Sequence, residues 1–165
     1  MLTTARSIAA ATAAGGLLLV GPVAAAPSGG RSLPIAAAMQ AAETALTSCA
    51  AQGYRVSVSV VDREGVQRLL LVGDGAGPIS ITTSRRKAYT SAALGVSTGD
   101  MQRQAAASNQ PPPAIDPEIL ALAGGLPIRM GDQVVAAIGV GGADRSDKDE
   151  ACAAAGLDRI RDQLN

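Results

Sequence analysis

The sequence predicts an α+β fold, in which helices cover an antiparallel sheet. Two observations support this fold class. First, short Val-rich segments occur in two pairs, and each pair is joined by a glycine-containing turn, as in a β-hairpin. Second, segments with helical spacing of apolar residues precede, separate and follow these pairs. Hairpins form antiparallel sheet, and the helices must cover its faces.

The composition is that of one globular domain. The chain has 165 residues, of which 47% are hydrophobic and 17% are charged, and these values exclude a disordered protein. It contains two Tyr and neither Phe nor Trp. Val, Leu, Ile and Ala must therefore build the core, without the flat stacking surfaces that aromatic rings provide.

The charges are balanced, with 14 basic and 14 acidic residues. The sequence has no basic stripe and almost no aromatic residues on which bases could stack, which argues against nucleic-acid binding. A balanced charge also offers little electrostatic resistance to self-association. We therefore expect a homo-oligomer and no nucleic-acid partner.

The amino-terminal segment has the pattern of a secretory signal peptide. Arg6 gives it a positive start, residues 8–20 are uncharged and mostly apolar, and small residues precede a cleavage site after Ala25. The alternative is a retained membrane anchor, but the apolar stretch is interrupted by glycines and ends in a cleavage-like site. We expect a periplasmic or secreted protein with no membrane contact after cleavage. The chain then divides into a signal peptide (1–25), a flexible lead-in (26–32) and one domain (33–165).

The first element expected in the domain is a helix over residues 33–52. Ser32 is a suitable N-cap, and Pro34 would lie in the first turn, where its missing N–H costs little. Gly53 fits a C-cap. Apolar residues at spacings of three and four predict one buried face, formed by Ile35, Met39, Ala42, Leu46 and Cys49.

Residues 55–72 predict the first hairpin. Valines alternate with serines over residues 55–61, which is the period of a strand with one buried face. A turn at residues 62–65 leads into a returning strand over residues 66–72. A glycine-rich connection then precedes the second half of the chain.

Two helices and a second hairpin follow. The helices are expected over residues 79–94 and near residues 99–107, and three consecutive prolines make residues 109–113 an extended loop. The strands of the second hairpin are expected at residues 124–130 and 134–140.

The last helix is expected from Asp147 to about Leu164. Asp147 and Glu150 have the spacing of a capping box. Four carboxylates gather here and could hold a metal ion through hard oxygen ligands, although carboxylates also favour a helix N-terminus through its dipole. They are Asp144, Asp147, Asp149 and Glu150.

Four stretches of the sequence resemble the GlcG/HbpS-like family, in order and along nearly the whole domain. The resemblance implies a profilin-like or roadblock-like domain with an antiparallel sheet of about five strands, in which the first and last helices lie side by side. Members are often oligomeric. The four stretches are residues 56–62 with Gly65, residues 74–76 with 87–92, residues 124–128, and residues 134–143 with 149–157.

The resemblance also implies an exported small-molecule-binding protein whose ligand is haem or another small molecule. Because the sequence contains no histidine, the candidate iron ligands are Thr90, Tyr89, Lys87 or a methionine. Arg86, together with Arg85, could pair with the propionates. The alternative is a helix that packs its Ala and Tyr side chains on the sheet and leaves Lys87 in solvent.

Two glycine-rich corners are candidates for lining the same pocket. They are Asp74-Gly75 and the stretch that contains Gly125 and Pro127. Exposed backbone N–H groups at such corners favour anions. The alternative is that both are sharp turns that require glycine.

The family fold implies a disulfide between Cys49 and Cys152, because it places the first and last helices next to each other. An oxidising compartment would allow the bond. The alternative is that the two cysteines are small buried apolar residues.

Two other functions stay open beside the binding protein. One is a ligand-free oligomeric module with a structural or signalling role, which the scarcity of aromatic residues and ionisable pairs favours. The other is an enzyme that acts on a small organic acid, which only neighbouring family members suggest. The absence of histidine excludes Ser–His and Cys–His nucleophile pairs and zinc sites of the usual composition.

Overall fold

The computed structural model of the chain describes residues 30–111 and 115–165. The predicted signal peptide (1–25) and most of the predicted lead-in lie outside these residues. The elements are, in chain order, α1 (Ile35–Ala50), β1 (Ser57–Asp62), β2 (Gln67–Val72), α2 (Pro78–Leu94), α3 (Thr98–Ser108), β3 (Gly125–Met130), β4 (Gln133–Gly141), α4 (Ser146–Arg159) and the short 3-10 helix η1 (Arg161–Gln163).

The described residues form one antiparallel sheet of four strands in the order β2-β1-β4-β3. The α+β class is therefore confirmed, whereas the expectation of about five strands is wrong by one for this part of the chain. Each hairpin contributes two strands, and the inner strands β1 and β4 pair with each other, with Val58 opposite Val140. The two hairpins thus join into one continuous sheet.

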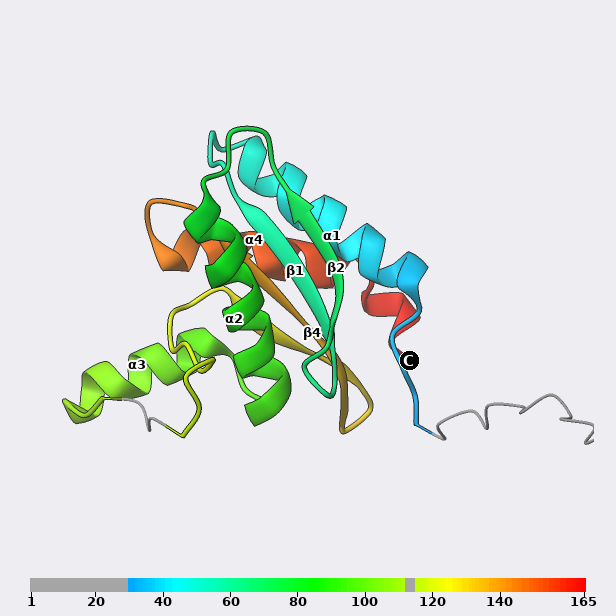
Figure 1. The fold of residues 1–165 in the computed structure, drawn as a ribbon. Helices are drawn as coiled ribbons and strands as arrows, with labels where there is room; N and C mark the ends of the chain where they lie inside the picture. The colour runs from blue at the N-terminus through cyan, green and yellow to red at the C-terminus, as the bar shows by residue number, and fades with distance from the viewer. Residues whose placement is uncertain (1–29, 112–114) are drawn as a thin grey trace, which may run out of the picture.

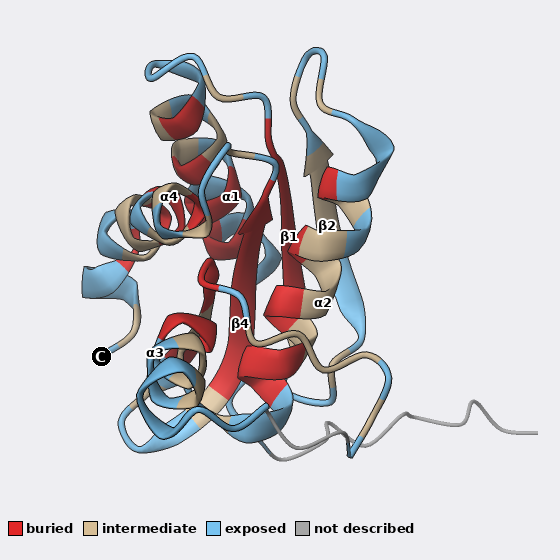
Figure 2. Cartoon of the chain, turned by 90° about the vertical axis from the view of Figure 1, so that its left-hand side faces the viewer, coloured by how far each residue is buried: buried red, intermediate tan, exposed pale blue. Residues whose placement is uncertain are grey.

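Helices cover both faces of the sheet (Figure 1). Helices α1 and α4 lie side by side on one face, α2 covers the other, and α3 projects from the end of the sheet. The strands β1 and β4 are buried along most of their length, whereas β2 at the edge is partly exposed (Figure 2). Within the described residues, no helix combines the length and hydrophobicity that crossing a membrane would require.

Strand β1 is buried on both faces, which corrects the prediction of one buried face. Val58 and Val60 belong to the core that α1 and α4 cover, whereas Val61 and the two serines pack against α2. Ser57 Oγ and Ser80 Oγ lie 2.7 Å apart and share a hydrogen bond. Ser59 Oγ and Ser84 Oγ share a second hydrogen bond, at 3.0 Å. A small hydroxyl group that makes a hydrogen bond can be buried at little cost. The alternating serines of β1 therefore do not indicate a face of the sheet that is exposed to solvent.

The buried face of α1 differs from the predicted one. Ile35 and Met39 are about half exposed. The helix packs on α4 through small residues because the two backbones approach closely: a Cβ atom on Gly156 of α4 would lie 2.3 Å from the carbonyl oxygen of Ala41. The helix also begins after Pro34, so Ser32 is not its N-cap. The buried residues of α1 are Ala37, Ala38, Ala41, Ala42, Ala45 and Cys49.

The predicted disulfide is confirmed. Cys49 of α1 and Cys152 of α4 are bonded, with their Cα atoms 5.6 Å apart and both side chains fully buried. The bond links the carboxyl-terminal end of α1 to the middle of α4.

The amino-terminal end of α4 is not a capping box, which corrects that prediction. The helix begins at Ser146, and no side chain caps it. Asp147 instead pairs with Arg145. The Glu150 carboxylate accepts hydrogen bonds from Ser97 Oγ at 3.2 Å and from the Gly124 amide at 3.3 Å. Contacts with the α2–α3 and α3–β3 connections, rather than local capping, orient this end of α4.

Candidate functional site

A buried ion pair joins α2 to α4 beneath the end of β4. Lys87 Nζ donates to Asp149 Oδ2 at 2.7 Å and to the carbonyl oxygen of Val140 at 3.0 Å. The other oxygen of Asp149 accepts from the Ala143 amide at 3.0 Å. Both side chains are almost fully buried, at 3% and 4% exposure. The alternative interpretation, in which Lys87 lies in solvent, is therefore wrong.

Two glycines make room for this pair. Gly124 has a φ of +124°, and a Cβ atom there would lie 2.9 Å from Lys87 Nζ. A Cβ atom on Gly125 would lie 2.3 Å from the Lys87 carbonyl oxygen. Both positions therefore exclude any larger residue. The Gly124-Gly125 corner lets β3 pass directly beside the lysine.

Burial shifts the ionisation of both partners. Desolvation raises the pKa of the Asp149 carboxyl above its ordinary value, although Lys87 opposes the shift. Desolvation likewise lowers the pKa of the Lys87 ammonium, although Asp149 opposes that shift. In both cases removal from water disfavours the charged form more than the attraction between the partners favours it.

The pair forms the floor of a cleft of about 380 Å³, here called the lysine cleft. Its charged groups are Lys87, Asp149 and Arg55, which gives a net positive charge. Its apolar residues Ile79 and Leu122 are unusually exposed, at 77% and 41%. The complete lining is Arg55, Gly77, Ile79, Ser80, Thr83, Lys87, Leu122, Gly142, Ala143, Ser146 and Asp149.

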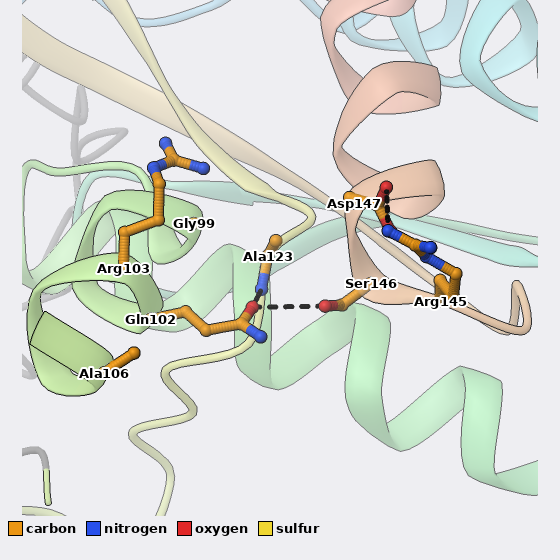
Figure 3. A pocket seen from close by; sticks show the side chains of 8 residues that line it. All are labelled: Gly99, Gln102, Arg103, Ala106, Ala123, Arg145, Ser146 and Asp147. Atoms are coloured by element: carbon orange, nitrogen blue, oxygen red, sulfur yellow. Dashed lines mark hydrogen bonds and ion pairs between the residues drawn. The ribbon is translucent and has the colours of Figure 1, made fainter. Parts of the chain in front are cut away.

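A second cleft of about 480 Å³, here called the arginine cleft, also has Ser146 in its lining (Figure 3). Its walls come from α3 and from the start of α4. Gln102 Oε1 links the two walls, because it accepts from the Ala123 amide at 2.8 Å and from Ser146 Oγ at 3.1 Å. Ser146 is therefore the residue that the two clefts share.

The arginines of the second cleft are already paired with carboxylates. Arg103 pairs with Asp100 at 2.8 Å and approaches Glu150 at 3.6 Å, and Arg145 pairs with Asp147 at 2.9 Å. These ion pairs balance the positive charge of the arginine cleft. The lysine cleft, with its excess positive charge, is the better candidate for an anionic ligand.

The other residues predicted on α2 hold a neighbouring segment in place. Thr90 Oγ1 donates to the Arg86 carbonyl at 2.7 Å and accepts from the Leu120 amide at 2.8 Å. Tyr89 Oη donates to Asp116 Oδ2 at 2.9 Å. The Arg86 guanidinium donates to the carbonyl oxygens of Pro117, Glu118 and Ile119. These residues attach the 116–120 segment to α2 and do not line the lysine cleft.

The residues predicted at the corners lie in three places. Asp74 and Gly75 are exposed in the β2–α2 connection, where Gly75 packs beside the Arg55 side chain. Gly125 packs on α2, and Pro127 lies in β3 opposite Ala137. Of the eight predicted binding residues, Lys87 alone lines the lysine cleft. A role of the others in binding stays a prediction.

Sequence reasoning missed Asp149 as the partner of Lys87, and it missed Arg55 and Ile79 as cleft residues. Asp149 was visible only as one of four carboxylates near a helix start. Within residues 30–111 and 115–165, no group of three or more His, Cys, Asp or Glu residues is arranged to hold a metal ion. Asp147, Asp149 and Glu150 instead make ion pairs and hydrogen bonds with neighbouring groups.

Comparisons with known proteins agree on a single family. The model of the family described as "Haem degrading protein HbpS-like" matches residues 33–158. A double mutant of HbpS from Streptomyces reticuli is 37% identical, with a TM-score of 0.73 over 84% of this chain and 95% of that chain. Protein ORFY of Klebsiella pneumoniae is 27% identical, with a TM-score of 0.73 over 84% of this chain and 97% of that one.

A more distant structure shares the fold. The PduOC protein, solved as a haem complex, is 17% identical, with a TM-score of 0.71 over 79% of this chain and 96% of that chain. At this identity the likeness concerns the fold alone. No functionally curated protein matches the chain.

Proposed function

Because this chain belongs to the HbpS-like family of haem-degrading proteins, we propose that it is an exported protein that binds an anionic small molecule of the haem class. The observation that carries the proposal is the lysine cleft, in which positive charge and exposed apolar side chains occur together. Haem itself combines an apolar ring with two carboxylates. The solved haem complex of PduOC supports this ligand class by analogy of fold.

The lysine cleft suits the propionates and the apolar ring of haem better than it suits the iron. Arg55 and Lys87 suit the propionates, and Ile79 and Leu122 suit the apolar ring. The sequence has no histidine, and the Thr90 hydroxyl both donates and accepts a hydrogen bond within the protein. The described residues thus fit the carboxylates of haem but not its iron.

Export is part of the same proposal. The pattern of residues 1–25 supports a signal peptide, and a periplasmic or secreted location follows from it. The Cys49–Cys152 disulfide supports an oxidising compartment, because such bonds are rare where thiols are kept reduced. A homo-oligomer remains our expectation and can be measured on the same samples by light scattering.

An absorbance titration of the purified protein with hemin tests the proposal. We expect a saturable Soret shift, and an Arg55→Ala variant should bind about fivefold more weakly, since an exposed ion pair contributes up to about 1 kcal/mol. The matched control is Arg161→Ala. Arg161 is also exposed, but it pairs with Asp158 near the other end of α4. A flat response from the native protein would reject haem and favour the ligand-free oligomeric module.

A further inference from the structure

The hydroxyl groups of the lysine cleft are already engaged within the protein. Ser80 Oγ donates to the Gly77 carbonyl at 2.6 Å and contacts Ser57 Oγ at 2.7 Å. Thr83 Oγ1 donates to the Ile79 carbonyl at 3.0 Å, and Ser146 Oγ donates to Gln102 Oε1 at 3.1 Å. None of these hydroxyl groups has a hydrogen left with which to bind a ligand. The recognition chemistry of the cleft must therefore come from its charged groups.

Lys87 retains one unused donor. An ammonium group has three N–H bonds. Within the described part of the chain, two of them are taken by Asp149 and by the Val140 carbonyl. The third has no protein acceptor there, and the side chain that carries it is almost fully buried at the floor of the cleft. This hydrogen suits an acceptor atom of a ligand.

The acceptors of the cleft, in contrast, are satisfied. One Asp149 oxygen accepts from Lys87 and the other from the Ala143 amide. A cationic ligand would have to displace one of these donors and would also meet the charge of Arg55. The cleft is therefore selective for anions over cations.

No side chain that is suited to bind iron faces this cleft. Tyr89 donates to Asp116 outside it, and this hydrogen bond raises the pKa of the phenol, which disfavours the phenolate that would bind ferric iron. Lys87 donates to Asp149 and to the Val140 carbonyl as an ammonium, and an ammonium has no lone pair to donate.

We propose that the lysine cleft recognises the carboxylate group of an amphipathic ligand through Lys87 and Arg55, with the apolar part of the ligand against Ile79 and Leu122. The inference deepens the proposed function and rests on it. It names the ligand class as amphipathic carboxylates, of which haem is one, and it makes binding independent of iron.

Three porphyrins separate carboxylate recognition from iron ligation. Hemin carries iron and two carboxylates, protoporphyrin IX carries only the carboxylates, and its dimethyl ester carries neither. We expect hemin and protoporphyrin IX to bind with similar Kd values, and the ester to bind at least about tenfold more weakly, because it lacks the charge-assisted hydrogen bonds. Absorbance reports hemin binding, and porphyrin fluorescence reports the other two. Binding of hemin without binding of protoporphyrin IX would overturn the inference and leave haem binding standing.

A second probe covers the case in which no porphyrin binds. Octanoate and octylamine have opposite charges and apolar chains that differ by only one methylene group. We expect octanoate, and not octylamine, to raise the Tm of the protein in a concentration-dependent way, because a ligand that binds only the folded state stabilises it. This result with no porphyrin binding would reject the haem class and retain the carboxylate site. No effect of octanoate, together with no porphyrin binding, would reject both.

A double variant tests the role of Lys87 without leaving a buried charge unpaired. Lys87→Met combined with Asp149→Leu replaces both partners by apolar side chains of similar size. We expect it to fold and to bind protoporphyrin IX at least about tenfold more weakly. Arg161→Ala again serves as the control. If the folded double variant binds with native affinity, Lys87 has a structural role only and the inference is wrong.

Discussion

Lys87 and Asp149 are the charged residues that the described part of the fold buries most completely. Each makes a second hydrogen bond to the backbone, so the pair is well satisfied. The pKa shifts of both groups nevertheless run in the direction that burial dictates. Removing one partner therefore differs from removing both, since the loss of one leaves a buried charge without compensation.

This asymmetry gives a prediction about stability. Lys87→Met alone should lower the free energy of unfolding by about 3–5 kcal/mol, whereas the Lys87→Met/Asp149→Leu double variant should be about as stable as the native protein or more stable. Urea denaturation followed by circular dichroism measures both values. Equal losses in the single and double variants would show that the ion pair itself stabilises the fold.

The pH dependence of stability follows from Asp149. The pKa of Asp149 is raised in the folded state. When the pH rises above the ordinary carboxyl pKa of about 4, the unfolded chain loses this proton while the folded protein still holds it. The contribution of Asp149 to stability is therefore largest below that pH and is lost as the pH rises through the raised pKa. We expect the unfolding free energy of the native protein, relative to the double variant, to fall as the pH rises above about 4. Urea unfolding of both proteins at several pH values measures this difference, and a rise would contradict the assignment.

At the scale of single residues, the sequence predicted Lys87 as a site residue but not its partner Asp149. Lys87 stood out because it lies in a stretch that resembles the family. Asp149 did not, since it lies 62 residues further along the chain and meets Lys87 only once α4 is placed against β4. Arg55 and Ile79 were missed for the same reason: side chains from separate loops and helices become neighbours only when the sheet has formed.

At the scale of the elements, the contact between α1 and α4 depends on small residues. Helix propensity alone would favour Ala over Gly at position 156 by about 1 kcal/mol. In the folded protein, however, a Cβ atom there would lie 2.3 Å from the Ala41 carbonyl oxygen and 3.1 Å from the Ala45 Cβ atom. The two helices would have to move apart, and their shared core would lose contacts.

We therefore expect Gly156→Ala to destabilise the protein, by about 1–3 kcal/mol for an overpacked interface. Thermal and urea denaturation measure the change. Asp158→Ala, at an exposed site of the same helix, is a suitable control and should change stability little. A stabilised Gly156→Ala variant would mean that propensity outweighs the close approach of the helices.

Local patterns predicted the elements well and the buried face of α1 poorly. Most boundaries differ by one or two residues from those expected, because valine alternation and the Gly and Pro positions act locally. The face of α1 differs because α4 packs closely against its alanines at positions 41 and 45, and this orientation leaves Ile35 and Met39 about half exposed. The size limit that a neighbouring helix imposes is not visible in the spacing of apolar residues.

For the whole molecule, the arrangement of the sheet could be predicted only in part. The sequence contains two hairpins, but nothing local states that β1 and β4 pair and leave β2 and β3 at the edges. The resemblance to the family supplied the fold and the adjacency of the first and last helices. From that adjacency came the one long-range contact that was predicted correctly, the bond between Cys49 and Cys152.

This bond closes a loop of 103 residues that contains all four strands and both clefts. A cross-link of that span restricts the unfolded chain and should stabilise the fold by about 4–5 kcal/mol on the chain-entropy account. We expect the Cys49→Ala/Cys152→Ala variant to lose stability of this order in urea denaturation. The unreduced, denatured native protein should show no free thiols with a thiol reagent, and the reduced protein should show two cysteines.

Reduction of the native protein in urea provides the matched comparison, because it removes the bond and leaves both side chains in place. If reduction and substitution lower the unfolding free energy equally, the effect belongs to the cross-link rather than to packing at positions 49 and 152. A loss well below 1 kcal/mol in both would mean that the unfolded chain already keeps α1 and α4 close, so that the bond restricts little. The fold would then depend on its small-residue helix contact and its core more than on the link between its first and last helices.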